Sequence, residues 1–502
     1  MSLLLTNDSP SIHTLGHLPP MPLVIEYSDR TTGTMAQNNI HFGLQQHGRV
    51  RRIVIRAPSS ILRTWLEPMN NLFPRLTDLS LLSTDIGKMD LMLPETLQAP
   101  DLRRLVVYGI SLPKGLPILS STTTLSTLSL THIGASCYFP PGQLVTQLQD
   151  LPRLEELSIG FAVPIPLPSS ERELLPPPIP PVTLPSLRRL KFQGVDAYLD
   201  NLVAQIITPL LVRLGLTFFF DLAFALVNLT EFIRRTDGFR CLVVRVNFNT
   251  DGSSIDVGHD EDVREIGLRI KCEPLDWQID SATQVCNAIG DVMSTVEELT
   301  LDLKVYGMLS EWENTLENTA WHELLLPFVG VKKLRIVSSL TLELSNALES
   351  VDGELVLELL PALQELEVFR DALAAPLKID RATNAFSMFM KTRESVGRPI
   401  HLLVPPAPAP APAPTPAPAP AVVIRPSLNE PRGETYQEAY PVWPSLNEPE
   451  RSEADLVWPS LGDIPDGHPR KFFGPTQPQP PESKWRARAL GLVGRLRGKN
   501  QN

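Results

Sequence analysis

Aliphatic residues recur along this chain in one spacing, Leu-x-x-Leu-x-aliphatic. The phrase is LPRLEELSIGF at residues 151–161, LPSLRRLKFQG at 184–194 and LPALQELEVFR at 360–370. In an extended strand the second and third aliphatic residues point to the same face, and the first lies on the turn that enters the strand. Each copy therefore predicts a short strand that buries three aliphatic side chains on one side.

The copies are spaced like structural repeats. Most successive copies start 23 to 35 residues apart, and one longer interval of 53 residues contains a weaker copy, EIGLRIKC at 265–272. A period of roughly 20 to 50 residues is typical of solenoids. The copies begin at Val50, Leu76, Leu102, Leu125, Leu154, Leu187, Leu211, Val243, Val296, Val331 and Leu363.

The segments between the copies supply the return path to the next strand. Several have helical periodicity, and a proline often precedes the next strand, where it ends a helix. Strand, helix and parallel strand, repeated about eleven or twelve times, predict an α/β leucine-rich-repeat solenoid, a horseshoe with a curved parallel sheet. We expect PLVIEY (22–27) as the first strand, PIHLLV (399–404) as the last, and helices over 61–72, 142–151, 197–207, 222–235 and 282–294.

One unit departs from the repeat. Asp251-Gly252 stands between two alternating runs in CLVVRVNFNTDGSSIDVG (241–258), which predicts a β-hairpin. Asn247, Asn249 and Asp251 also resemble the start of an EF-hand calcium loop. That loop needs a bidentate glutamate at its twelfth position, where this chain has Gly258, so we expect no calcium site.

Charge is distributed unevenly. The 502 residues carry a formal net charge of −11, but residues 483–502 contain six basic residues and no acid, which leaves −17 on the remainder by subtraction. An acidic body repels the phosphate backbone, so we expect no nucleic-acid partner for the main domain.

The usual sequence motifs of enzymes and cofactor sites are absent. The four cysteines form no C-x-x-C pair, and the chain contains no phosphate-binding glycine loop, nucleophile elbow or H-E-x-x-H motif. We expect no enzyme activity, cofactor or metal. The opening MSLLLTNDSP is too short for a signal peptide and no segment has about 18 uncharged apolar residues, which predicts an intracellular protein, cytoplasmic or nuclear.

The outward positions of the strands are the candidate binding residues. In three successive units they are basic or amide side chains, which we expect to stack on one face and to bind an acidic partner protein. The alternative is a solvated strand face, because outward strand positions are normally polar. The candidates are Arg189, Lys191, Gln193, Arg213, Arg245 and Asn247.

Several phrases resemble the repeat region of fungal F-box proteins with leucine-rich repeats, over about residues 15–404. They are PPMPLVIEY, QQHGRVRRIVIR, LMLPETLQAPDLRRLVV, ALVNLTEFIRRT and AFSMFMKTRESVGRPIHLLV. The resemblance implies repeats that capture a substrate for a cullin-type ubiquitin ligase, with an F-box docked on the Skp adaptor. The first twenty residues contain no LPxE opening. The chain is then either a substrate-recognition arm whose F-box lies outside it, or an interaction module or scaffold without a ligase.

The C-terminal part has a different composition. A Pro/Ala linker is followed by three copies of a Pro-Ser-Leu phrase, which indicate either a multivalent linear motif or a duplication without a ligand. Residues 484–499 can form a basic amphipathic helix for an anionic membrane or acidic partner, or remain a solvated tail. The motif residues are Pro426, Leu428, Trp443, Pro444, Leu446, Trp458, Pro459 and Leu461.

The predicted organisation has five parts and a monomeric state. The parts are a disordered N-terminus (1–14), the solenoid (15–404), the linker (405–421), a disordered tail with the three motifs (422–482) and the basic amphipathic segment (483–502).

Overall fold

The computed structural model divides the chain into two compact units, residues 1–410 and 411–502. All described residues belong to the first unit. The predicted linker, the Pro-Ser-Leu motifs and the basic segment lie outside the described residues. The residues that the structure describes are 3–6, 21–28, 34–85, 91–113, 117–163, 181–219, 226–236, 239, 241–259, 264–272, 275–304, 318–349, 358–369 and 384–403.

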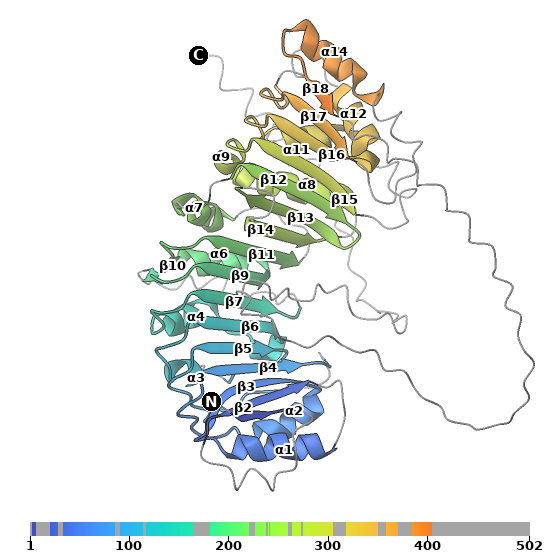
Figure 1. Ribbon diagram of the computed structural model, residues 1–502. Helices are drawn as coiled ribbons and strands as arrows, with labels where there is room; N and C mark the ends of the chain where they lie inside the picture. Colours follow the sequence, from blue (N-terminus) through green and yellow to red (C-terminus); the bar gives the residue numbers. More distant parts are fainter. Residues whose placement is uncertain are drawn as a thin grey trace, which may run out of the picture. The chain divides into compact units, whose positions relative to one another are not determined.

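A 16-stranded sheet organises the first unit (Figure 1). Its order is β1-β2-β3-β4-β5-β6-β7-β9-β11-β14-β13-β12-β15-β16-β17-β18, and neighbours are parallel except that β13 is antiparallel to β12 and β14. The predicted α/β class with a large, mostly parallel sheet is confirmed. The strands are β1 (Leu3–Leu5), β2 (Leu23–Ser28), β3 (Val50–Ala57), β4 (Asp78–Ser83), β5 (Arg104–Tyr108), β6 (Thr127–Ile133), β7 (Glu156–Phe161), β9 (Arg189–Gly194), β11 (Arg213–Phe219), β12 (Val243–Asn249), β13 (Gly252–Gly258), β14 (Arg264–Lys271), β15 (Glu298–Lys304), β16 (Lys333–Val337), β17 (Glu365–Phe369) and β18 (His401–Leu403).

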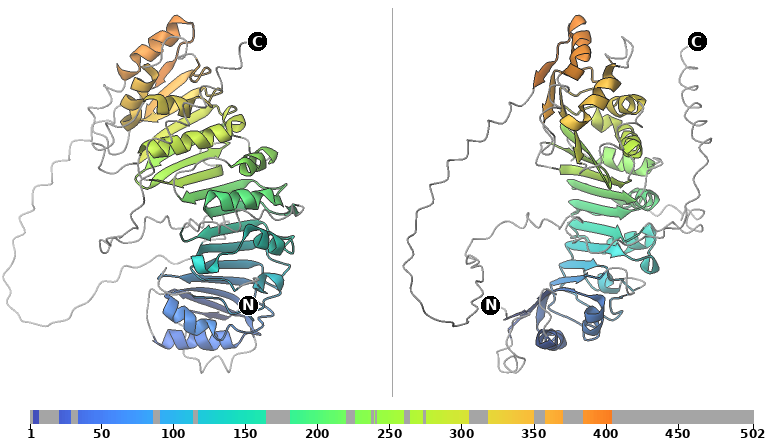
Figure 2. Two further views of the ribbon diagram at one scale, coloured as in Figure 1. Left: turned by 180° about the vertical axis from the view of Figure 1, so that it is seen from behind. Right: turned by 90° about the vertical axis from the view of Figure 1, so that its right-hand side faces the viewer.

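The helices gather on one side of this sheet (Figure 2). Two short strands, β8 (Val182–Thr183) and β10 (Ile206–Ile207), pair separately. The helices are α1 (Thr34–Gln45), α2 (Ser59–Leu66), α3 (Pro117–Ser120), α4 (Pro141–Leu148), α6 (Asp196–Ala204), α7 (Val227–Arg235), α8 (Leu275–Ala288), α9 (Gly290–Met293), α11 (Asn318–Leu325), α12 (Thr341–Glu349) and α14 (Ser387–Ser395).

The repeated aliphatic residues form the core between the strands and their return segments. Leu154, Leu157 and Ile159 of one copy are each 1 % exposed, and they belong to one continuous apolar cluster that also contains the buried faces of the helices. Side chains between them, such as Ser158, lie on the opposite, outward face. The strand phase predicted from the spacing is therefore confirmed for this copy.

Several local expectations differ from the structure; the helices expected over 61–72 and 142–151, for example, end at Leu66 and Leu148. Leu3–Leu5 form β1 and pair with β2, although residues 1–14 were expected to lack structure; this pairing buries Leu5. The copy assigned to Val243 begins at Cys241, because Val243 is half-buried and lies on the outward face, whereas Cys241 is buried as a small apolar residue. The helix expected over 197–207 ends at Ala204, after which Ile206 enters β10.

Candidate binding face of the sheet

The middle of the sheet does not follow chain order. After β11 the chain passes to β12, three places away, returns through β13, and places β14 directly beside β11. The predicted hairpin is confirmed as the β12–β13 pair, with Asn249 opposite Gly252. Gly252 has a φ of +150°, and a Cβ atom there would lie 2.0 Å from the carbonyl oxygen of Ile270. Glycine is needed at this turn because β14 passes so close.

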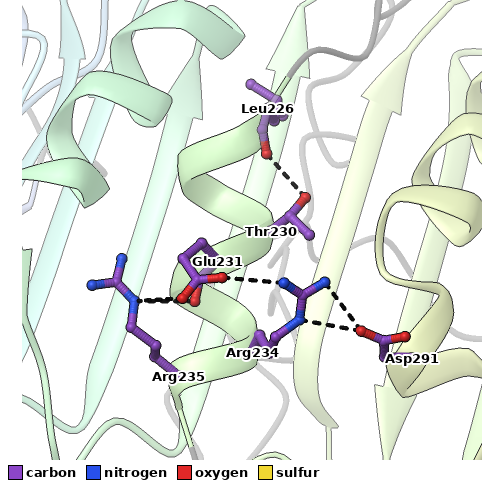
Figure 3. Close-up of polar contacts among 6 residues, drawn as sticks. All are labelled: Leu226, Thr230, Glu231, Arg234, Arg235 and Asp291. Carbon is purple, nitrogen blue, oxygen red and sulfur yellow. Dashed lines mark hydrogen bonds and ion pairs between the residues drawn. The ribbon is translucent and has the colours of Figure 1, made fainter.

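Helix α7 connects the two sides of this inversion and is held at both ends. At its start, the Asp200 carboxylate of α6 accepts hydrogen bonds from the Leu229 backbone N–H (2.9 Å) and from Asn228 Nδ2 (2.7 Å). At its end, Arg234 bridges Glu231 of α7 (3.1 Å) and Asp291 of α9 (3.0 Å), as Figure 3 shows. These contacts tie α7 to helices that precede and follow the inserted strands.

The strands β9 and β11 bring part of the predicted site together. Arg189 lies opposite Arg213, Lys191 opposite Gly215, and Gln193 opposite Thr217 in the parallel register. These residues alternate with buried residues, so they lie on the outward face of the sheet, away from the helices.

The structure separates the other two predicted residues from this group. Arg245 and Asn247 belong to β12, and both β14 and β13 lie between that strand and β11. Asn247 is 5 % exposed and donates a hydrogen bond to Ser254 Oγ (3.1 Å). The expectation that three successive units stack side by side was wrong, because β14 and β13 are inserted between β11 and β12 in the sheet.

Two basic residues of β14 occupy the place expected for β12. Arg269 lies opposite Thr217, and Lys271 lies opposite Phe219 with its Nζ atom 5.2 Å from the ring centroid. The alternation of Ile266, Leu268 and Ile270 with polar residues carried the signal for their outward direction. We call the outward group of β9, β11 and β14 the cationic face: Lys191, Arg213, Arg269 and Lys271.

Cations outnumber carboxylates on and beside the cationic face. Arg189, beside it, forms an ion pair with Glu156 of β7. Arg213 and Arg269 form no ion pair within the described residues. Two outward carboxylates lie among these cations: Glu265 of β14, and Asp256 of the neighbouring strand β13, which lies opposite Gly267.

The outward face of β15, β16 and β17 gives a contrast. There Arg335 pairs with Glu298 (3.4 Å) and Glu367 (3.2 Å), and Lys333 also pairs with Glu367 (3.1 Å). These side chains are each 22–32 % exposed. Since cations and carboxylates alternate there in register, that part of the sheet has its charges compensated internally.

Other chemistry has little support in the described part of the chain. Burial raises the pKa of the Cys286 thiol to about 12, and burial with the Glu265 carboxylate does the same for Cys241, so neither is a reactive thiolate. No group of three or more His, Cys, Asp or Glu side chains within the described ranges could hold a metal ion. None of the described helices has the length and apolar character needed to cross a bilayer.

Comparison with known proteins gives no family assignment. No protein-family model matches the sequence, and no curated protein matches it. A search of solved structures found the crystal structure of a TLR13–ssRNA13 complex, with a TM-score of 0.27 and 12 % sequence identity over 73 % of this chain. The match spans 46 % of that protein's chain. Likeness at this level carries no argument about fold or function.

Proposed function

We propose that this protein is a leucine-rich-repeat solenoid without enzymatic activity, and that its cationic face binds an acidic partner protein. The observation that carries the proposal is the clustering of Lys191, Arg213, Arg269 and Lys271 on three adjacent strands of a chain with a net charge of −11. The acidic remainder of the molecule repels an acidic partner, whereas a local positive surface attracts it. The partner is therefore oriented toward that one face.

Electrostatics sets the properties expected of this binding. Exposed cations contribute little to folding, typically about 0 to 1 kcal/mol each, yet they control association rate and partner choice. At about 0.01 M ionic strength the screening length is roughly 30 Å, which exceeds the width of three strands. Binding should therefore weaken steeply as salt is added.

Charge reversal tests the proposal. The probe is a fluorescein-labelled oligoglutamate peptide at low ionic strength, read by fluorescence anisotropy. We expect the double variant Lys191→Glu/Arg213→Glu to bind roughly tenfold more weakly or worse. The matched control, Arg63→Glu/Lys391→Glu, changes net charge equally at exposed positions of α2 and α14. Equal loss in the two variants would show a net-charge effect and refute the cationic face as the site.

A second candidate function is the substrate-recognition arm of a cullin-type ubiquitin ligase. It is supported by the resemblance of residues 15–404 to the repeat region of fungal F-box proteins, and it places the F-box outside this sequence. Affinity purification of the product of the full-length transcript, followed by mass spectrometry, tests it. Recovery of the Skp adaptor and a cullin is the expected result, and their absence would leave an interaction module or scaffold without a ligase.

A further inference from the structure

Two glycines interrupt the outward side chains in the middle of the cationic face. Gly215 of β11 and Gly267 of β14 lie opposite each other in the parallel register, and both are half-buried. Glycine weakens a strand because it packs no side chain and loses more conformational entropy on folding. Two of them side by side in one sheet therefore need a reason other than strand stability.

The packing around these glycines does not require them. A Cβ atom at Gly215 would meet nothing closer than Lys191 Cγ at 3.4 Å, and one at Gly267 nothing closer than Asp256 Oδ1 at 3.4 Å. Both distances are ordinary contacts, and neither glycine has the positive φ that Gly252 has. The sheet would accept larger residues here, unlike at Gly252.

The missing side chains leave bare backbone between Lys191 of β9 on one side and the Asp256 carboxylate of β13 on the other. Lys191 flanks Gly215 across the sheet, Arg213 precedes it by two residues on the same face, and Arg269 follows Gly267 by two. A glycine in a strand interior often marks a place where another backbone approaches closely. Here the approach would bring the ligand beside three cations, Lys191, Arg213 and Arg269, with the Asp256 carboxylate on the β13 side.

We infer that the partner presents an extended acidic segment whose main chain lies against the Gly215–Gly267 gap, with its carboxylates beside Lys191, Arg213 and Arg269. This inference rests on the proposed function and specifies how the partner is held there. Extended acidic peptide fits both features, because its backbone is narrow enough for the gap and its carboxylates complement the surrounding charge.

Filling the gap without changing charge tests the inference. Gly215→Val and Gly267→Val add bulk suited to a strand. The control, Ser80→Val, adds a valine to the same outward face on β4, outside the cationic face. We expect each glycine variant to bind oligoglutamate roughly tenfold more weakly with an unchanged urea midpoint, and Ser80→Val to bind like the unmodified chain. Gly215→Ala and Gly267→Ala, which add one carbon, should weaken binding less.

The outcomes separate this inference from the proposed function. If Gly215→Val and Gly267→Val bind normally while Lys191→Glu/Arg213→Glu binds weakly, the cationic face stands and close approach to the gap is wrong. If the unmodified chain does not bind oligoglutamate at low salt, both ideas fail. If a valine variant loses binding and also has a lower urea midpoint, the loss could come from a damaged fold. The alanine variants then decide, and normal binding by both of them would overturn the inference.

Discussion

Truncation of a core leucine measures how much each repeat depends on its aliphatic side chains. Leu157 is 1 % exposed and lies in register between Leu128 and Leu190, which are both 0 % exposed. Because these neighbours are fixed in parallel strands, the site cannot collapse fully around a smaller residue. We expect Leu157→Ala to lower the free energy of unfolding by about 3 to 5 kcal/mol, which combines lost burial with a residual cavity.

The matched control lies one residue further along the same strand. Ser158 is half-buried and lies on the outward face, so Ser158→Ala should change the free energy of unfolding by no more than about 0.5 kcal/mol. Urea unfolding followed by far-ultraviolet circular dichroism compares the two variants. Similar destabilisation by both, or a larger effect of Ser158→Ala, would show that the strand phase is wrong.

Two further predictions concern the hydrogen bonds from Asp200 that hold the start of α7, here called the α7 clamp, and the buried thiols. Asp200→Ala should destabilise the fold by about 1 to 2 kcal/mol, because it leaves the Leu229 N–H without its acceptor. The control Asp150→Ala, at an exposed position, should have no effect. Equal urea midpoints for the two variants would refute the clamp. In a Cys137→Ser/Cys272→Ser background, Cys241 and Cys286 should resist Ellman's reagent at pH 8 until the chain unfolds, because burial raises the pKa of both to about 12. Rapid reaction of either thiol in the folded chain would contradict their burial.

The sequence predicts well what depends on local spacing. Leu154, Leu157 and Ile159 are buried as their spacing requires, because alternation in a strand follows from backbone geometry alone. Asp251-Gly252 predicts the hairpin turn for the same reason, since turn conformation depends on the residues in the turn.

The order of strands in the sheet is not a local property. Arg269 and Thr217 are neighbours although 52 residues separate them, whereas Arg245, which is nearer in sequence, lies two strands further away. Alternation identifies the outward face of each strand but not its neighbour. The sequence therefore predicted the adjacency of β9 and β11, placed β12 wrongly beside β11, and gave no sign that β14 lies there, while the binding role of these residues stays a prediction.

Reversal of one charge on β14 and one on β12 tests the central claim most directly. Chain order would place Arg245 beside the β11 residues of the proposed face, whereas strand order in the sheet places Arg269 there. If β9, β11 and β14 form the site, Arg269→Glu will weaken oligoglutamate binding several-fold at low ionic strength, and Arg245→Glu will leave it nearly unchanged. An equal loss in both variants, or a greater loss in Arg245→Glu, would contradict a binding face built from these three strands.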